Sequence, residues 1–338
     1  MDSRQLEIAD FLAKAGWQNA ARTPLAGDAS PRRYDRVIRA SDQVSAVLMD
    51  APKEKGEDIG PFLEVGRFLF DNGFSAPEIY AADTSKGLIL MEDLGDDLFA
   101  RVCVSAPDLE TTIYGAAVDT LSSLHEIGPP AFLDPYSTDV YNREANLLTE
   151  WYLPAIAANP VGVEVQQEYS GLLQSACGAI SGDHTCCVLR DYHAENLLWL
   201  PERTKNARVG LLDFQDALLG HPAYDLVSLL EDARRDTDAD LREAMIARYL
   251  ARSGVDAEAF LQAYATLGAQ RNLKIIGIFA RLCRRDAKPA YVDLIPRVWQ
   301  HLQNDLSHPA LADLRHFVNT HVPQPEPSVL AALKGSDG

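Results

Sequence analysis

Two carboxylates and an amide follow one another closely between residues 191 and 213. Asp191 and Asn196 belong to the segment 189–197 (LRDYHAENL), and Asp213 follows Asp191 by 22 residues. Oxygen atoms of Asp and Asn suit a hard cation such as Mg²⁺, which takes few protein ligands because phosphates and water supply the others. A carboxylate that is free of metal can orient a hydroxyl group and accept its proton. These are the requirements of phosphoryl transfer to an alcohol.

Short apolar runs place these side chains at one end of a predicted hairpin. Residues 197–200 (LLWL) and 209–212 (VGLL) read as strands, and the polar segment 201–208 reads as the turn between them. Antiparallel pairing brings Asn196 and Asp213 to the same open end, about 5 Å apart along the backbone. A further strand over 186–189 leads into the loop that carries Asp191.

The rest of the chain predicts a small sheet followed by helices. An amphipathic helix is expected over 1–17 and a second helix over 59–72, with strands over 32–39, 44–49, 77–81 and 87–91. The polar segment 92–97 reads as a linker. Helices are then expected over 109–126, over 142–152 with an end at Pro154, and repeatedly over 222–320. Residues from 322 on read as a loosely attached tail.

Composition narrows the function classes. A length of 338 residues allows two lobes with separate cores. A net charge of −18 argues against nucleic-acid binding, and no apolar run reaches the roughly 18 residues of a membrane span. The five cysteines have no metal-ligand spacing, and the N-terminus lacks the features of a signal peptide. We therefore expect a cytoplasmic protein without nucleic-acid, membrane or obligate protein partners.

These motifs resemble the protein-kinase-like fold, and in particular the aminoglycoside phosphotransferase family, over nearly the whole chain. The resemblance implies an α+β, bilobal fold with a small N-terminal antiparallel sheet plus helix and a larger, mainly helical C-terminal lobe. The nucleotide-binding lobe would span 1–95 with a linker near 92–97, the catalytic and substrate lobe 98–321, and the tail 322–338.

The resemblance also assigns roles to residues. It implies that Asp191 is the catalytic base beside a kinase-like Arg190, that Asn196 and Asp213 hold Mg²⁺, and that Asp225 braces the catalytic loop. The implied ATP contacts lie on the linker and on the loop 27–33 above the phosphates: Met91, Glu92 and Leu94, and Ser30, Arg32 and Arg33.

Two positions depart from the family pattern. Leu189 stands where the family usually has His, and Met49 stands near the place of the phosphate-binding Lys. Arg32, Arg33 or Arg36 would supply the missing charge, and Glu64 would be a remnant of the partner of that Lys.

Within the family, four segments are similar to anomeric kinases of bacterial cell-wall (peptidoglycan) recycling, which phosphorylate C1 of N-acetylmuramate and N-acetylglucosamine. They are 28–34, 47–52, 92–97 and 189–197. A hemiacetal hydroxyl is more acidic than an ordinary alcohol, so a carboxylate base suffices. The candidate sugar contacts are Glu144, Trp151, His193 and Asp216.

Two other functions stay open at this stage. One is a kinase of a different small alcohol, such as an aminoglycoside or a choline-like molecule. The other is a pseudokinase-like binding module, which the missing Lys favours and the complete set of Asp191, Asn196 and Asp213 opposes.

Overall fold

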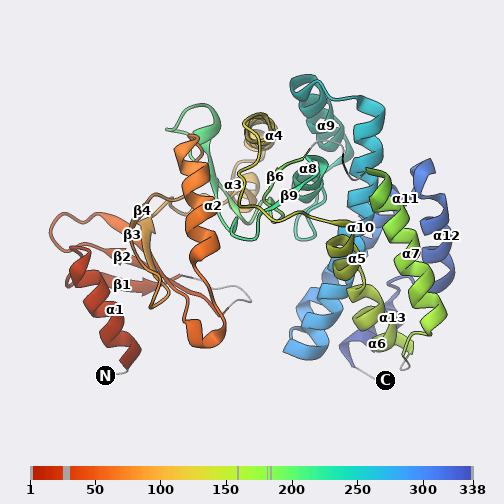
Figure 1. Ribbon diagram of the computed structural model, residues 1–338, viewed down its shortest axis with the longest axis horizontal. Helices are drawn as coiled ribbons and strands as arrows, with labels where there is room; N and C mark the ends of the chain where they lie inside the picture. Colours follow the sequence, from red (N-terminus) through yellow and green to blue (C-terminus); the bar gives the residue numbers. More distant parts are fainter. Residues whose placement is uncertain (1–2, 26–30, 158–159, 181, 183–184, 336–338) are drawn as a thin grey trace. The chain divides into compact units, whose positions relative to one another are not determined.

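The computed structural model describes residues 3–25, 31–157, 160–180, 182 and 185–335 (Figure 1). The chain divides into two compact units, each assembled from two stretches of sequence. Unit 1 comprises Met1–Thr120 and Glu195–Ala217, and unit 2 comprises Leu121–Ala194 and Leu218–Gly338. The predicted lobes were 1–95 and 98–321, whereas the contacts group 98–120 and 195–217 with the N-terminal part.

Unit 1 contains a five-stranded antiparallel sheet with the order β1-β2-β3-β5-β4. Its strands are β1 (Ala21–Pro24), β2 (Arg33–Ile38), β3 (Ser45–Asp50), β4 (Ile79–Asp83) and β5 (Leu88–Glu92). The sheet confirms the predicted N-terminal architecture. Strand β1 was not predicted, because its sequence ARTP holds little apolar surface and ends at a proline.

One face of the sheet is covered by helix α1 (Ser3–Lys14). Residues at i, i+3 and i+4 of this helix, namely Ile8, Phe11 and Leu12, pack against apolar side chains from β2, β3 and β5. The sheet side of this core is formed by Val37, Ala46, Leu48, Leu88 and Leu90. Side chains alternate along a strand, so Tyr34, Arg36, Val47 and Met49 lie on the opposite face.

A second hairpin in unit 1 joins β7 (Leu197–Trp199) to β8 (Val209–Leu211). The backbone attaches it to earlier parts of the unit: Trp199 N donates to Asp97 O at 2.8 Å, and Leu211 N donates to Ser75 O at 2.9 Å. These bonds explain why 195–217 belongs to unit 1. The unit also contains α2 (Gly60–Asp71) and α3 (Phe99–Ser105), and α4 (Glu110–Glu126) begins in it.

Unit 2 is mainly helical and confirms the predicted character of the C-terminal part. Its small sheet pairs β6 (Cys186–Val188) with β9 (Leu218–Gly220). Its helices are α5 (Thr138–Ala145), α6 (Leu153–Ala157), α7 (Val163–Ile180), α8 (Ala223–Leu230), α9 (Ala239–Ser253), α10 (Ala257–Asp286), α11 (Ile295–Leu306), α12 (Ala312–His321) and α13 (Pro327–Lys334).

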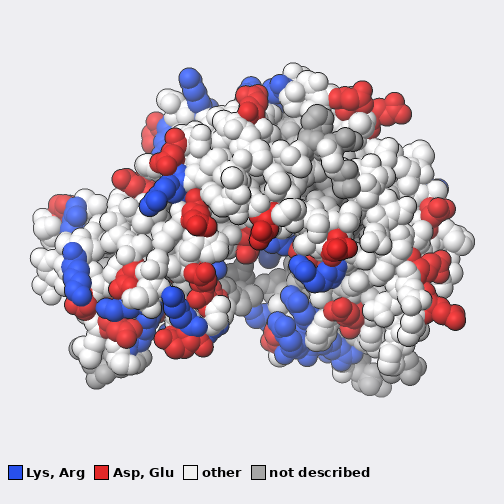
Figure 2. Space-filling view, viewed as in Figure 1, with Lys and Arg blue, Asp and Glu red and all other residues white. Residues whose placement is uncertain are grey.

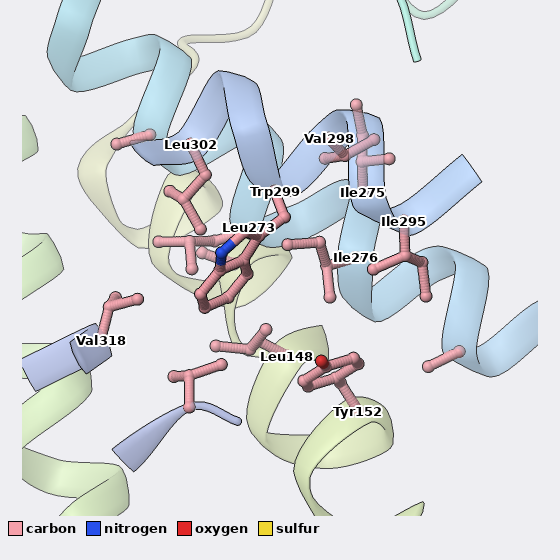
Figure 3. Packing of buried hydrophobic residues seen from close by; sticks show 14 of the residues in the cluster. Leu148, Tyr152, Leu273, Ile275, Ile276, Ile295, Val298, Trp299, Leu302 and Val318 are labelled. Carbon is pink, nitrogen blue, oxygen red and sulfur yellow. The ribbon is translucent and has the colours of Figure 1, made fainter. Parts of the chain in front are cut away.

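The 30-residue helix α10 runs through the core of unit 2. In Figure 3, Leu273 and Ile276 of α10 lie beside Trp299 of α11 and Leu148 of the π-helical turn η3 (Leu148–Tyr152). Gly277 permits this packing, because a Cβ atom there would lie 2.3 Å from the carbonyl carbon of Leu147. The close approach of two backbones therefore requires glycine at this position.

The predicted helix over 142–152 was expected to end at Pro154, but the helical path continues. It changes from α5 to η3 and then to α6, in which Pro154 is the second residue. Proline is tolerated in the first turn of a helix, where its missing N–H is not needed.

The C-terminal segment is not the loosely attached tail expected from 322 on. Val322 and Leu333 are buried in the core of unit 2, and Val329 and Leu330 pack against it. The Tyr152 hydroxyl donates to Pro323 O at 2.7 Å. The prediction was wrong because the segment begins with the polar sequence PQPEP. The helix that follows it is amphipathic, and its apolar residues recur at helical spacing.

Acidic side chains are scattered over the face shown in Figure 2 rather than collected in one patch. No helix among the described residues is long and apolar enough to cross a membrane.

Candidate active site

The β7–β8 hairpin brings Asn196 and Asp213 together in unit 1. Leu197 pairs with Leu211, and Leu212 N donates to Asn196 O at 3.0 Å. The side chains converge as well, because Asn196 Nδ2 lies 3.5 Å from Asp213 Oδ2. This geometry confirms the hairpin predicted from the two apolar runs and the polar turn.

Asp213 is held in an unusual conformation. Its φ of +56° lies in the left-handed region, which non-glycine residues adopt at a cost, aspartate more readily than most. Gln215 Nε2 donates to Asp213 Oδ1 at 2.7 Å. The next residue, Phe214, stacks on Phe62 of α2 with a centroid distance of 4.8 Å. A Cβ at Gly66 would lie 3.2 Å from the Phe214 ring, so the helix approaches this segment closely.

The hydroxyl of Tyr34 in β2 is influenced electrostatically by both Asp213 and Arg32. Tyr34 stands opposite Met49, the residue near the place of the missing Lys. Burial raises the pKa of Tyr34, Arg32 opposes the rise, and Asp213 adds to it. Arg32 Nε bonds Glu57 Oε2 at 2.6 Å, and both side chains are mostly buried. Glu57 therefore orients the guanidinium of Arg32.

The other residues predicted to contact phosphate are not placed like Arg32. Arg33 is exposed and points to the opposite face of β2, since successive strand residues alternate. Arg36 is bound by two carboxylates, with Nε 2.7 Å from Asp93 Oδ2 and Nη1 2.9 Å from Asp96 Oδ2. Its charge is therefore already compensated. Ser30 lies outside the described residues.

The linker is fastened to the sheet of unit 1. Met91 is buried in β5, and Leu94 packs in a small apolar cluster. The carboxylate of Glu92 forms an ion pair with Arg203, whose Nη1 donates to Ser75 Oγ at 2.8 Å. The side chain of Glu92 is thus already paired within the protein. Glu92 is also the last residue of β5.

In unit 2, a buried carboxylate braces the loop before Asp191. Asp225 accepts hydrogen bonds from Leu189 N at 2.7 Å and from Arg190 N at 2.8 Å. Burial raises the pKa of Asp225 to about 7, against the effect of these two bonds. Arg190 has a φ of +71°, and Ser228 Oγ donates to its carbonyl oxygen at 3.1 Å. The bracing role that the resemblance implied for Asp225 matches this geometry.

Positive charges surround Asp191. Burial alone would raise its pKa, but Lys274, His193, Arg271 and Arg190 outweigh burial and lower the pKa below its ordinary value. Asp191 is therefore ionised at neutral pH.

Glu144 is the centre of an ion-pair cluster in unit 2. One of its oxygens pairs with Arg190, and the other lies 2.9 Å from Lys274 Nζ. The Tyr136 hydroxyl also donates to Glu144, and it lies 3.0 Å from the Tyr224 hydroxyl. Burial would raise the pKa of Glu144, but Lys274, Arg190 and Tyr136 lower it. The carboxylate thus links Arg190, the neighbour of Asp191, to helix α10.

The other candidate sugar contacts are spread over the two units. His193 is buried in unit 2, and burial lowers its pKa against the charges of Asp232 and Asp191. Trp151, in the same unit, is partly buried against the main apolar core. Asp216 is exposed in unit 1.

Three residues of these clusters were missed by sequence reasoning. Arg271 and Lys274 are three residues apart on α10. Lys274 lies in the otherwise apolar run 273–280, and Arg271 lies two residues before that run. Two cations on one helical face amid apolar residues were the available signal. Tyr34 was detectable as the strand residue between Arg32 and Arg36 that shares their face.

Asn196 and Asp213 fit a magnesium ion. Their polar ends lie 3.5 Å apart, and carboxylate and amide oxygens are the donors that this ion prefers. In the part of the chain that the structure describes, no group of three or more His, Cys, Asp or Glu is arranged to hold a metal ion. The chemistry of the donor set therefore favours a cation that takes most of its ligands from phosphate and water.

Comparisons with known proteins agree with this geometry. Residues 21–264 match the family described as "Phosphotransferase enzyme family". The chain is 38% identical to the N-acetylmuramate/N-acetylglucosamine kinase of Caulobacter vibrioides, over 95% of this chain and 97% of that protein. It is 33% identical to the protein of the same name from Pseudomonas aeruginosa, over 91% of each. Its fold is similar to that of an aminoglycoside phosphotransferase solved with streptomycin and ATP, with a TM-score of 0.58 at 15% identity over 92% of this chain and 97% of the other.

Proposed function

This chain belongs to the phosphotransferase enzyme family, and on that premise we propose that it is an ATP-dependent kinase of the anomeric C1 hydroxyl of N-acetylmuramate and N-acetylglucosamine. The observation that carries the chemistry is the hairpin that holds Asn196 and Asp213 together five residues beyond Asp191. The names of the two relatives support the choice of sugar. We further propose that the protein acts in the cytoplasm, where ATP is available, in the recycling of cell-wall sugars.

Asp191 is the proposed base. Its ionised carboxylate orients the C1 hydroxyl and accepts its proton as the oxygen attacks the γ-phosphorus, whose bond to the bridging oxygen breaks to release ADP. The surrounding cations, of which Lys274 has the largest effect, lower its pKa and keep it ionised. Asp225 and Ser228 fix the backbone of Arg190 and thereby the position of its neighbour Asp191.

Asn196 and Asp213 are the proposed holders of Mg²⁺. When bound, the ion neutralises the charge of the ATP phosphates and orients them. The protein contributes the position of the two ligands, which the hairpin and the bond from Gln215 determine.

ATP is proposed to contact the linker and the β2 end of the sheet in unit 1. The backbone from Met91 to Leu94 offers hydrogen bonds to adenine. Arg32, oriented by Glu57, is the proposed substitute for the missing Lys. Ser30 is proposed as a further phosphate contact, whereas Arg33 points to the opposite face of β2.

The sugar contacts proposed in unit 2 are Glu144, His193 and Trp151, and Asp216 is proposed in unit 1. The ion pairs of Glu144 add a positioning role, because its carboxylate holds Arg190 and Lys274 at once. Loss of Glu144 would free both cations beside Asp191.

A coupled ATP-consumption assay with magnesium tests the proposal. N-acetylmuramate, N-acetylglucosamine, an aminoglycoside and choline serve as acceptors, and phosphorus NMR identifies the product. A C1 phosphate on an N-acetylated sugar is the expected result. Turnover of a different alcohol would overturn the sugar assignment, and ATP binding without any turnover would favour a binding module.

A further inference from the structure

A cavity of about 430 Å³ lies in unit 2. Its lining comes from the segment 236–242, at the start of α9, and from 293–304, at the start and along one side of α11. None of the residues proposed above for catalysis, metal, ATP or sugar lines it. The volume lies within the range of small-molecule sites and accommodates a monosaccharide derivative.

The charges of the lining leave one cation uncompensated. The carboxylate of Asp236 is paired with Arg297 (Oδ2 to Nη2 2.9 Å), and that of Asp293 is paired with Lys334 at 2.6 Å. Arg242 donates to the backbone oxygen of Thr237. Among the described residues, no carboxylate lies within ion-pair distance of Arg242.

The buried carboxyl of Asp305 feels the charge of Arg242 but does not form an ion pair with it. Arg242 acts electrostatically on Asp305, but burial and repulsion from Glu231 raise the pKa of Asp305 well above its ordinary value. Asn272 Nδ2 bridges the two carboxyls at 2.7 and 2.9 Å. Burial and Glu231 therefore favour the neutral form of Asp305.

His301 is a buried polar residue of the lining. The residue is 6% exposed, and its buried Nε2 has no hydrogen-bond partner among the described residues. Burial and the charges of Arg242, Arg271 and Arg297 lower its pKa to about 4, although Asp236 opposes them. The ring lies in a positive environment, so an anion bound in the cavity would raise its pKa.

We propose that this cavity binds the anionic group, a carboxylate or a phosphate, of a small sugar. Arg242 supplies the charge, and the ring of His301 and the side-chain amides of Gln300 and Asn304 supply neutral hydrogen bonds. Arg suits this task because its planar guanidinium binds carboxylate and phosphate through two parallel bonds. The choice of a sugar rests on the proposed function, whereas the anionic character follows from Arg242, for which the described residues offer no carboxylate partner.

Nuclear magnetic resonance of the full chain tests the site directly. The protein has eight histidines, so ¹³C-labelled imidazoles give few signals, and a His301→Gln variant identifies that of His301. N-acetylmuramate and N-acetylglucosamine 1-phosphate are the anionic probes, and N-acetylglucosamine is the neutral control. At least one anionic probe should shift the His301 signal saturably and raise its pKa above about 4, while the neutral sugar leaves both unchanged.

The cation is tested with a matched pair of variants on α9. Arg242→Met should weaken binding of the active probe about tenfold or more, because a hydrogen bond to a charged group contributes roughly 1.5–3 kcal/mol. Arg248→Met removes an exposed cation from the same helix and should leave binding unchanged. Thermal unfolding of both variants checks that the fold is retained.

The outcomes separate the two sources of the anion. If N-acetylmuramate is the active probe, the cavity takes the carboxylate of the acidic sugar. If N-acetylglucosamine 1-phosphate is the active probe, the cavity takes the phosphorylated product. No shift with either anion, or an equal loss in Arg242→Met and Arg248→Met, overturns the proposal. A saturable shift in a protein without kinase activity overturns the proposed function and leaves the site standing.

Discussion

The carboxylate of Asp225 accepts a hydrogen bond from the backbone N–H of Arg190 at 2.8 Å, across 35 residues of sequence. A second bond from the preceding N–H completes the arrangement. A residue with no proposed substrate contact thus determines the backbone path directly before the proposed base. Its effect on stability and that on turnover are both measurable.

Asp225→Asn should remove a pH dependence of stability. The pKa of Asp225 is raised to about 7 in the folded protein, against about 4 when unfolded. A raised carboxyl pKa contributes stability that is full below pH 4 and is lost as pH rises through about 7. Urea unfolding at pH 4.5 and 7.5 should therefore show a smaller decrease for the variant than for the wild type. An equal decrease in the free energy of unfolding for both proteins would contradict the raised pKa of Asp225.

Asp191→Asn should abolish most turnover while leaving nucleotide binding intact. Loss of a general base costs roughly 10²–10⁴-fold in kcat. The control is Glu202→Gln, which removes an exposed carboxylate from the β7–β8 turn and should change neither property. Near-normal kcat in Asp191→Asn would mean that another group accepts the proton.

Lys274→Met should move the acidic limb of the pH profile. Lys274 is the largest of the charges that lower the pKa of Asp191, so its removal raises that pKa. The acidic limb of kcat/KM should therefore shift to higher pH. Arg285→Met, at an exposed position of the same helix, provides the control and should leave the limb in place. A lower kcat with an unshifted limb would indicate a purely structural role.

Arg32→Met should weaken binding of ATP and ADP by about tenfold and leave adenosine binding unchanged, because only the phosphates meet the guanidinium. Glu57→Gln, which removes the partner of Arg32, should have a smaller effect in the same direction. Arg39→Met serves as the control, since Arg39 pairs with Asp42 at the end of the strand. Calorimetry with the three ligands distinguishes loss of a phosphate contact from general damage, which would weaken adenosine as well.

Gly277→Ala should destabilise the protein by about 1–3 kcal/mol, because its Cβ would lie 2.3 Å from the backbone at Leu147. Gly171→Ala on α7 is the matched change, since a Cβ there meets nothing within 4 Å. That variant should be more stable by roughly 0.5–1 kcal/mol, because alanine favours a helix. The melting temperatures of the two variants should therefore move in opposite directions.

The sequence predicted the elements whose pattern is local. Asn196 and Asp213 were placed together correctly because two apolar runs and a polar turn specify a hairpin without help from the rest of the chain. Strand β9 (Leu218–Gly220) was missed because three residues give no periodicity. Lys274 and Arg271 were missed because a charge on a helix normally faces solvent, so their place amid apolar residues of α10 was not interpreted as inward-facing.

The interleaved order of the two units has a consequence for synthesis of the chain. Leu211 N bonds Ser75 O, and Ser75 Oγ donates to Ala207 O, so unit 1 gains its last backbone partners from residues made more than 120 positions later. Until that point has left the ribosome, the first 120 residues carry unpaired groups and an unfinished core. Neither unit can be excised as one continuous fragment, since each is built from two separate stretches. Unit 1 therefore cannot complete its fold until the β7–β8 hairpin has been synthesised. Chains truncated between residues 121 and 194 should be aggregation-prone rather than form a folded nucleotide-binding module.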